Sequence, residues 1–455
     1  MARSSKSAVE AAGEGDQHVL AVSDLTGRTL VLNRPKALNS LTLGMVQSIK
    51  RRLEEWERSE LCSVVMIRSN SAKAFCAGGD VVQVSRDWRA GQRGAAMRFF
   101  QTEYAVNHYI ASYEKPIVAL LNGYTMGGGV GLSVHAPFRV ATEATVFSMP
   151  ETRIGFVPDV GATFFLPRLD GQTGTYLGLT GQRLRGRDLL YAGIATHYVP
   201  SERLPLLEQR LQGVGTSDYA VVNDAIEEFA AQPEDAPIEY SLAGVRGCID
   251  RCFQHNTVEA IVDALRDEAS GAEHAAWAQA TLDALARMSP SSLKLTLEQL
   301  RKGRQLNIQQ AFALELRLAE ARLASHDMHE GIDALLVRKT DDARWDPPTL
   351  AAADMAQLYE QYFGTAGSYR PRFVHEGAAF AEYPHAFGLP SEAAIGALVR
   401  GDNPQAGGFG LTRAEVLRFF ERERAGKIGV AKKVAWVLDR RTRTLPDSDT
   451  LKWLD

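Results

Sequence analysis

Apolar residues follow two different periods along this chain, and the change between them divides it into regions. Up to about residue 150, short apolar runs alternate with stretches in which apolar residues recur every three or four positions. These patterns predict strands at 19–22, 29–32, 64–67, 117–121, 138–140 and 145–149, and helices at 43–56, 95–112 and from the glycine turn near 127 to His135. Such strand–helix–strand repetition is typical of an α/β core with right-handed crossovers.

From about residue 173 to residue 363 the spacing is mainly helical. Its amphipathic stretches lie at 282–288, 293–300 and 308–323. These helices pack either on their own core or on a neighbouring chain, so the sequence leaves a homo-oligomer open. Residues 364–368 have the composition of a linker, and residues 369–455 then form a C-terminal extension.

The second half of this extension is basic. Residues 413–443 contain ten lysines and arginines and four acids, a net charge of +6. Two interpretations stay open for this stretch. It is either a solvated helical face, or a docking surface for an acidic partner such as RNA.

The overall composition excludes several classes of protein. The chain has 455 residues, 45% of them apolar, and a net charge of −4, so it has no global attraction to nucleic acid or anionic lipid. The most apolar stretch, 117–134, contains Asn122 and five glycines, so no membrane-spanning helix is expected. The four cysteines are too few to staple a chain of this length, which indicates a reducing compartment.

The first seventeen residues are small and polar, and they are predicted to be disordered or to be the remnant of a presequence. Arg3 and Lys6 suggest targeting to an organelle. Glu10, Glu14 and Asp16 argue against a complete presequence, because transit peptides avoid acids.

Cys248, Cys252 and His255 lie close enough in the sequence to raise the question of a metal site. They supply three ligands and no partner pair, whereas a structural zinc site needs four. The preferred interpretation is helix packing at i, i+4, and no metal is predicted.

Two glycine loops suggest chemistry at a carbonyl group. The loop at 75–80 and the loop at 127–129 each follow a predicted strand, where sites gather in α/β sheets. Gly79 and Gly128 lack a Cβ, so a ligand can approach the backbone there, and Gly128 stands where a helix begins. Two backbone N–H groups directed at one oxygen would form an oxyanion hole.

Glu151 and Asp159 flank one loop that follows the strand at 145–149. Each carboxylate has an ordinary alternative: Glu151 as an exposed loop acid or helix-start charge, and Asp159 as the N-cap of a following helix. Together they favour a paired acid/base role.

These residues fall within motifs that resemble the enoyl-CoA hydratase/isomerase (crotonase) superfamily, and most closely its 3-hydroxyisobutyryl-CoA hydrolases. The motifs are N-R-P-K-A-L-N-S-L (33–41), K-A-F-C-A-G-G-D (73–80), T-M-G-G-G-V-G-L-S (125–133) and M-P-E-T-R-I-G-F-V-P-D-V-G (149–161), with weaker agreement at 288–296 and 326–336. The resemblance covers about residues 18–363. It implies a crotonase-like ββα-superhelix core that binds acyl-CoA over 18–270, a helical region over 271–363, and the extra extension.

The resemblance also implies roles. Gly79 and Gly128 match the oxyanion-hole donors, Ala77 the residue whose carbonyl receives the CoA adenine, Glu151 the principal catalytic acid, Asp159 the second acid of the hydrolases, and Glu103 a substrate-contacting acid. Neither a metal nor a separate cofactor is implied, because CoA is part of the substrate.

Two positions depart from the patterns of this superfamily. Hydratases carry a second glutamate where this chain has Gly131, which disfavours addition of water to a C=C bond. Hydrolases usually carry a second glycine where this chain has Ala162, whose methyl group is expected to crowd the acyl pocket.

The expected function is therefore hydrolysis of a short 3-hydroxyacyl-CoA thioester, with 3-hydroxyisobutyryl-CoA of valine degradation as the family substrate, in the mitochondrial matrix. The acyl group itself stays open, since 3-hydroxypropionyl-CoA has a similar shape. Two alternatives remain: an interaction component of a mitochondrial ribosome built on the hydrolase scaffold, with its basic extension as the contact, and an enoyl-CoA isomerase.

Overall fold

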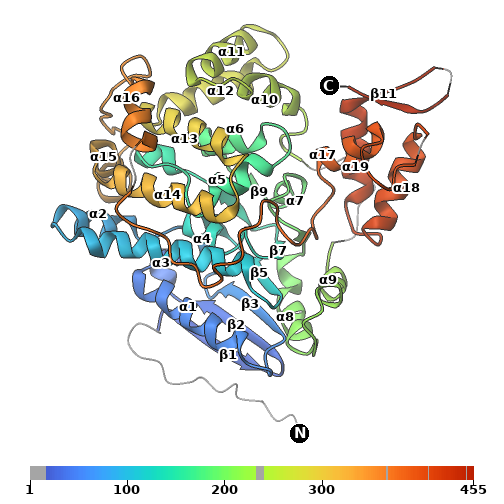
Figure 1. Ribbon diagram of the computed structural model, residues 1–455, viewed down its shortest axis with the longest axis horizontal. Coiled ribbons are helices and arrows are strands. Elements are labelled where there is room, and N and C mark those ends of the chain that lie inside the picture. Colours follow the sequence, from blue (N-terminus) through green and yellow to red (C-terminus); the bar gives the residue numbers. More distant parts are fainter. Residues whose placement is uncertain (1–16, 232–239, 365–366, 408, 447, 455) are drawn as a thin grey trace.

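Two sheets form the framework of this protein in a computed structural model that describes residues 17–231, 240–364, 367–407, 409–446 and 448–454 (Figure 1). The larger sheet has the strand order β1-β2-β3-β5-β7-β10. Its strands are β1 (Val19–Asp24), β2 (Gly27–Leu32), β3 (Val64–Ser69), β5 (Ile117–Leu121), β7 (Phe138–Ala141) and β10 (His197–Tyr198). Only β1 and β2 pair antiparallel; the other neighbours are parallel. The predicted strands at 19–22, 29–32, 64–67, 117–121 and 138–140 are thereby confirmed, while the predicted disorder of residues 1–17 lies, except for Gln17, outside the described residues.

The second sheet positions the loops of interest. Its order is β4-β6-β8-β9, with β4 (Ala74–Cys76), β6 (Tyr124–Met126), β8 (Val146–Ser148) and β9 (Leu184–Arg185). The strands β4, β6 and β8 run parallel, with Cys76 opposite Thr125 and Met126 opposite Ser148. Because the carboxyl ends of parallel strands meet at one edge of a sheet, the two glycine loops and the loop after β8 leave from the same edge. The sequence pattern predicted β8 but missed β4 and β6, which border the two glycine loops and were assigned to them.

Helices cover these sheets and carry much of the core. The first four are α1 (Leu43–Glu57), α2 (Val81–Arg89), α3 (Arg93–Ser112) and α4 (Gly128–Gly131). The long helix α3 packs against α1, α2 and α14 (Ile308–Leu323), and most of its residues are buried. The helix predicted to run to His135 was wrong in length, because α4 ends at Gly131. Glycine stabilises helices poorly, and a Cβ at Gly129 would stand 2.2 Å from the Cys76 carbonyl oxygen, so close packing on β4 replaces helical continuation.

The region after β8 is mainly helical, as predicted. Its helices are α5 (Ala162–Phe165), α6 (Thr173–Thr180), α7 (Asp188–Tyr191), α8 (Leu204–Gln212), α9 (Tyr219–Glu227), α10 (Arg246–Phe253), α11 (Val258–Ser270), α12 (Ala275–Ala286), α13 (Pro290–Gly303), α14 (Ile308–Leu323), α15 (His326–Ile332) and α16 (Met355–Tyr359), with π-helical turns at η6 (Asp333–Arg338) and η7 (Glu360–Gly364). A capping box between Asn307 and Gln310 starts α14, since each side chain accepts a hydrogen bond from the other's backbone N–H.

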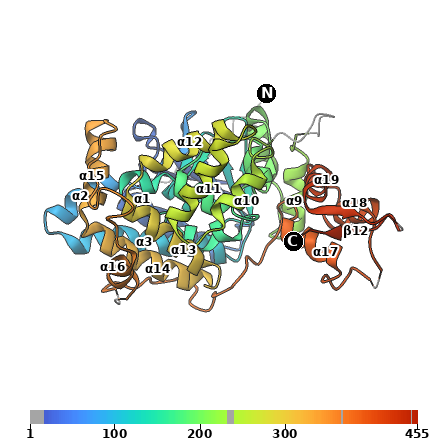
Figure 2. The same cartoon turned by 90° about the horizontal axis from the view of Figure 1, so that it is seen from above.

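The C-terminal extension has two parts. Residues 367–391, here called the strap, cross the surface of the core, and residues 392–454 form a small unit at its side (Figures 1 and 2). This unit contains α17 (Glu392–Arg400), α18 (Arg413–Glu423), α19 (Val430–Arg441) and the hairpin β11 (Thr442–Thr444) and β12 (Leu451–Trp453). It has its own apolar cluster, which includes Ile395, Val416, Phe420, Val434 and Trp453.

Several basic side chains of residues 413–443 form ion pairs within the protein. Lys433 lies 2.7 Å from Asp170, and Lys427 pairs with Glu227, so two lysines of this stretch are buried against the core. Arg440 bridges Asp250 and Glu392 at 3.5 and 3.3 Å. Three of the ten cations counted from the sequence, Lys427, Lys433 and Arg440, therefore fasten the small unit to acids of the core. Neither sequence interpretation, a solvated face or a partner surface, foresaw this use.

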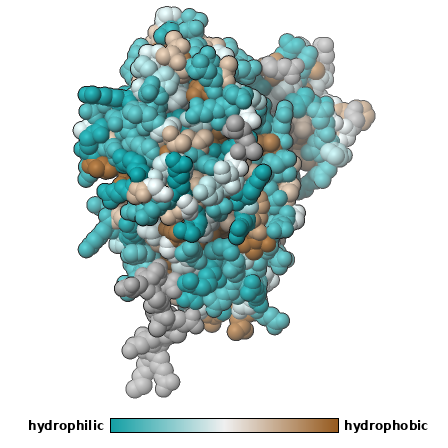
Figure 3. Space-filling view, turned by 60° about the vertical axis from the view of Figure 1, so that its left-hand side comes forward, coloured by the Kyte–Doolittle hydropathy of each residue, from teal (hydrophilic) through white to brown (hydrophobic). Residues whose placement is uncertain are grey.

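No helix within the described ranges is long and apolar enough to cross a membrane. The face shown in Figure 3 is mostly hydrophilic, with apolar residues scattered over it.

Candidate active site

All six residues singled out from the sequence line one cavity of about 120 Å³. Ala77 and Gly79 come from the loop after β4, Gly128 from the loop after β6, and Glu151 from the loop after β8. The set is completed by Glu103 of α3 and by Asp159. Apolar side chains close the cavity around them: Val81, Phe99, Phe100, Met126, Ile154, Phe156, Val160 and Leu336. The structure thus brings the six together, while their chemical roles remain predictions.

The two glycines present bare backbone to this cavity. A Cβ on Gly79 would stand 2.7 Å from Cζ of Phe99, and one on Gly128 would stand 2.4 Å from Oε1 of Glu103. Neither glycine N–H donates a hydrogen bond within the described part of the chain. Both donors are therefore available to a ligand, as an oxyanion hole requires.

Three buried carboxyl groups face the same space. Glu103, Glu151 and Asp159 are 2–5% exposed. Burial, followed by the charge of Asp159, raises the pKa of both glutamates well above the usual range, and the charge of Glu151 adds to the effect on Glu103. Burial also raises the pKa of Asp159 to about 7, although a hydrogen bond from Tyr104 opposes the rise. The pKa of Asp159 places proton exchange at this residue near neutral pH.

Two oxygens in this group have no partner among the described residues. Oε1 of Glu103 and Oε2 of Glu151 are buried and accept no hydrogen bond. A buried carboxylate oxygen without a donor is costly, so these atoms suit a ligand or water that enters the cavity. The sequence alternative of an exposed loop acid is wrong for Glu151, which starts the short 3₁₀ helix Glu151–Ile154 in a buried position.

Asp159 is held by a hydroxyl group rather than used as a helix cap. The Tyr104 hydroxyl donates to Oδ2 of Asp159 at 2.7 Å. Helix α5 starts after Gly161, which is its N-cap with a φ of 90°, and no side chain caps it. The N-cap alternative for Asp159 is therefore wrong.

The loop that carries Asp159 is supported by residues the sequence did not identify. Both oxygens of the buried Glu315 in α14 accept backbone hydrogen bonds, from Gly161 at 2.7 Å and from Thr163 at 2.8 Å. Burial, with a contribution from Asp159, raises the pKa of Glu315 to about 8. One signal was visible: Glu315 lies among the apolar positions of the 308–323 helix, where a charge needs a partner.

A second support reaches the loop from the strap. Nε2 of His135 lies 2.7 Å from the carbonyl oxygen of Val160, and its Nδ1 lies 2.7 Å from the Tyr383 hydroxyl. Burial lowers the pKa of His135 to about 4, so the ring is neutral at physiological pH. Because a carbonyl oxygen only accepts, Nε2 carries the proton and Tyr383 donates to Nδ1. The two hydrogen bonds of His135 thus fix the backbone of Val160, the residue that follows Asp159. The φ of Val160 is +53°, which is unusual for a β-branched residue.

The two positions that depart from the family pattern have different surroundings. A Cβ at Gly131 would stand 2.7 Å from Oδ1 of Asn107 and 2.8 Å from Cβ of Val160, so there is no space for an acid at this place. Ala162 is fully buried at the start of α5 and is not among the residues that line the cavity. The predicted crowding of the acyl pocket by its methyl group therefore does not follow from this geometry.

The cysteines that raised the question of a metal site lie among other residues than those expected from the sequence. Cys248 and Cys252 are buried on α10, and Cys248 lies with Glu268 and His274 in a group whose candidate ligand atoms are within 4.8 Å of one another. Arg251 donates to Sγ of Cys248 at 3.3 Å and to both oxygens of Glu268. The guanidinium group already supplies the positive charge there, so these residues do not fit a metal ion.

Comparison with known proteins places this geometry in context. Residues 27–363 match the model of the family described as enoyl-CoA hydratase/isomerase. The 3-hydroxyisobutyryl-CoA hydrolase of Danio rerio, a mitochondrial protein, is 44% identical over 71% of this chain and 83% of its own length, and the human one is 42% identical over 74% and 86%. The small ribosomal subunit protein mS47 of Neurospora crassa is 41% identical over 97% of this chain and 89% of its own length.

Two solved structures share the fold. A carnitinyl-CoA dehydratase from Mycobacterium thermoresistibile has a TM-score of 0.71 and 35% identity, covering 79% of this chain and all of its own. An enoyl-CoA hydratase from Rhodobacter sphaeroides has a TM-score of 0.67 and 36% identity, covering 76% and 97%. The predicted α/β fold with a helical C-terminal region is confirmed by these likenesses.

Proposed function

Because the chain belongs to the enoyl-CoA hydratase/isomerase family, we propose that it hydrolyses the thioester of a short 3-hydroxyacyl-CoA, such as 3-hydroxyisobutyryl-CoA, to the free acid and CoA. One observation carries the proposal. Three buried carboxyl groups face two unpaired glycine N–H groups in one cavity, while the position of a hydratase's second glutamate is a glycine packed against Asn107. The hydrolases found in vertebrates support the same substrate class.

The first step is polarisation of the thioester. Its carbonyl oxygen accepts hydrogen bonds from the N–H groups of Gly79 and Gly128, and the negative charge that develops in the transition state stays on that oxygen. The carboxyl group of Glu103, whose Oε1 lacks a partner, hydrogen-bonds the 3-hydroxyl group of the substrate. The CoA adenine is expected at the carbonyl of Ala77, as the resemblance implies.

Glu151 then starts the transfer as a carboxylate, when the proton of the buried acids lies on Asp159, and it does so by one of two routes. It attacks the carbonyl carbon and expels the CoA thiolate, which leaves a mixed anhydride for water to hydrolyse, or it removes a proton from a water that attacks directly. In both routes the C–S bond breaks and the thiolate needs a proton. Asp159, with a pKa of about 7, is suited to donate that proton and to orient the water. The reaction needs neither a metal nor a redox cofactor.

A thiol-release assay tests this proposal directly. The wild-type chain and the Glu151→Gln variant are incubated with 3-hydroxyisobutyryl-CoA, 3-hydroxypropionyl-CoA, acetyl-CoA and an enoyl-CoA. We expect release of CoA from the 3-hydroxyacyl thioesters by the wild type and about 10²–10⁴-fold slower release by the variant. Equal rates for the two proteins, or no CoA release from any thioester, would refute the assignment. A shifted double bond in the enoyl-CoA without free thiol would favour an isomerase.

A second function is supported by a separate observation. The relative from the small ribosomal subunit aligns with 97% of this chain, whereas the two hydrolases described above leave more than a quarter unmatched. We propose that the chain also serves as a component of the small subunit of a mitochondrial ribosome; the hydrolase relatives, too, are mitochondrial. Sedimentation of an organelle lysate tests this: the protein should travel with small subunits at low salt, and a chain found only in the unbound fraction would contradict it.

A further inference from the structure

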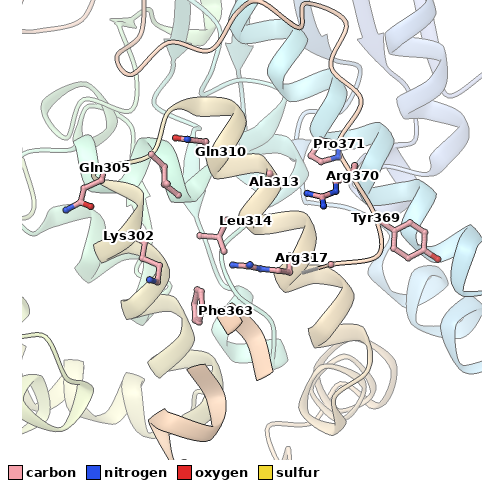
Figure 4. Close-up of a pocket in the computed structure, with 12 residues that line it drawn as sticks. Lys302, Gln305, Gln310, Ala313, Leu314, Arg317, Phe363, Tyr369, Arg370 and Pro371 are labelled. Carbon is pink, nitrogen blue, oxygen red and sulfur yellow. The ribbon is translucent and has the colours of Figure 1, made fainter. Parts of the chain in front are cut away.

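A second and larger cavity lies apart from the candidate active site. Its volume is about 470 Å³, and none of its lining residues belongs to the first cavity. It extends over helix α14 between two walls (Figure 4). One wall is the end of α13 with the loop after it and Phe363, and the other is the strap from Gly367 to Pro371. A volume of this order is typical of sites for small organic ligands.

Positive charges approach this cavity from three elements. Lys302 comes from α13, Arg317 from α14 and Arg370 from the strap, and no carboxylate is among the residues that line it. Figure 4 shows Arg317 extending along α14 toward Phe363, and Arg370 directed from the strap toward α14. Lys302 also contacts the hydroxyl of Tyr359 at 2.9 Å and Glu298 at 3.3 Å at the rim. The lining therefore favours an anion, and more than one negative charge.

The remaining lining is apolar, aromatic or amide. Leu306, Ala313 and Leu314 form the apolar part, and Phe363 supplies a ring, whereas the ring of Tyr369 is directed away from α14 (Figure 4). The ammonium group of Lys302 lies 5.6 Å from the centre of the Phe363 ring. Gln305 and Gln310 add groups that both donate and accept hydrogen bonds. This combination suits a flat, partly apolar body joined to a strongly charged group.

We propose that this cavity binds an organic phosphate of nucleotide size. Arginine and lysine together recognise phosphate oxygens, and a diphosphate carries enough charge to engage cations from more than one wall. The ring of a base would lie against Phe363, and the amides of Gln305 and Gln310 would reach its polar edge. The site is independent of the proposed hydrolysis.

The site is also specific to a chain with the extension. Gly367, Tyr369, Arg370 and Pro371 all follow residue 363, where the match to the family ends. Without the strap, the cavity would lose one wall and one of its three cations. A protein that ends near residue 363 is therefore not expected to bind in this way.

Titration calorimetry of the full chain with ADP tests the proposal. Two variants place a negative charge at the cavity, where it should repel a phosphate. Arg370→Glu reverses a charge on the strap, and Gln310→Glu adds a carboxylate on α14. The second variant protects the fold, because glutamate at this third helical position keeps the capping box with Asn307. Arg372→Glu is the matched control, since Arg372 is exposed on the same strap and does not line the cavity.

We expect ADP to bind the wild type, and each of the two variants to bind it about tenfold more weakly while Arg372→Glu binds as the wild type does. Adenosine and inorganic phosphate, which each supply one half of the ligand, should both bind more weakly than ADP. Absence of ADP binding at millimolar concentration would overturn the proposal. Equal affinity in the wild type and in both variants would also overturn it, because ADP would then be bound elsewhere, for example at the CoA site.

Discussion

The two sides of the candidate active site are held in place by different means. On the glycine side, backbone contacts place Gly79 and Gly128: the register of β4, β6 and β8, and the backbone hydrogen bonds of Leu41 with Gly78 and Asp80. The function of the two glycines depends on the absence of side chains. On the acid side, Asp159 lies in a loop that is fixed by side chains from α3, from α14 and, through His135, from the strap. The glycine side should therefore be sensitive to added atoms, and the acid side to lost hydrogen bonds.

The two sides of the site also differ in whether they bury ionisable groups. Close backbone approach at Gly128 and Gly129 requires no buried charge, whereas the acid side confines Asp159 and Glu315 in a space where burial raises the pKa of both. Stability is lost where carboxyl groups ionise in such a site, and catalysis uses the same shifted groups.

The largest effect is expected on the acid side, from Asp159→Asn. An amide cannot protonate the CoA thiolate, so the rate of thiol release should fall by about 10²–10⁴-fold while the affinity for substrate changes little. Steady-state kinetics with 3-hydroxyisobutyryl-CoA measures both quantities. Asp263→Asn, at an exposed residue paired with Arg266, is the control and should leave the rate unchanged. An unchanged rate in Asp159→Asn would remove this residue from the mechanism.

The same variant changes the dependence of stability on pH. The folded pKa of Asp159, about 7, is raised above the ordinary value of 3.8, so the folded state favours the neutral form. Its contribution is complete below the unfolded pKa and is lost as the pH rises through the folded one. Urea unfolding at a series of pH values should show stability falling over this window in the wild type and a shallower fall in Asp159→Asn. Parallel curves would contradict the assignment of the shift to Asp159.

On the glycine side, Gly128→Ala should reduce turnover by about 10²–10³-fold, the effect of losing one oxyanion-hole donor. The added Cβ would stand 2.4 Å from Oε1 of Glu103 and 3.0 Å from Cδ1 of Leu41, so the loop must move and its N–H with it. Thiol release measures the loss. Gly94→Ala serves as the control, because a Cβ there meets nothing within 4 Å. A Gly128→Ala protein with wild-type turnover would show that this N–H does not contact the reacting oxygen.

A smaller effect is expected from Glu315→Gln. Two backbone N–H groups, of Gly161 and Thr163, donate to separate oxygens of Glu315, and glutamine offers only one acceptor. The other N–H is then buried without a partner, which should cost about 1–3 kcal/mol of unfolding free energy. Urea unfolding near neutral pH measures it. Glu298→Gln, on the neighbouring helix at a partly exposed pair with Lys302, should cost much less. Equal losses in the two variants would contradict a specific role for Glu315.

The two sides of the site also differ in how far they could be predicted from the sequence. Gly79, Gly128, Glu151 and Asp159 stand in local motifs after short strands, and period and composition are enough to find such places. Ala77 and Glu103, which lies within α3, were predicted from the family resemblance. The supports of the acid side join residues far apart: 154 positions separate Glu315 from Gly161, and 248 separate Tyr383 from His135. No local pattern encodes such distances. The strands β4 and β6 were missed for a different reason, since they border the glycines at 78–79 and 127–129 and were assigned to loops.

The smallest effect, and the sharpest test of the strap, is expected from Tyr383→Phe. This change removes only the hydroxyl that donates to Nδ1 of His135, two contacts away from Asp159. The loss of one buried hydrogen bond should cost about 1 kcal/mol of unfolding free energy. It should also lower turnover several-fold with little change in KM, because Val160 keeps its positive φ less firmly. Tyr369→Phe removes the hydroxyl group of another tyrosine of the strap, which does not line the active-site cavity, and this variant should leave turnover unchanged. Nitrogen chemical shifts of His135 give a readout independent of activity: the wild type should show the proton on Nε2, and Tyr383→Phe should shift the Nδ1 signal. If that signal and turnover both stay as in the wild type, the strap does not position the catalytic loop, and the two sides of the site would then depend on the core alone.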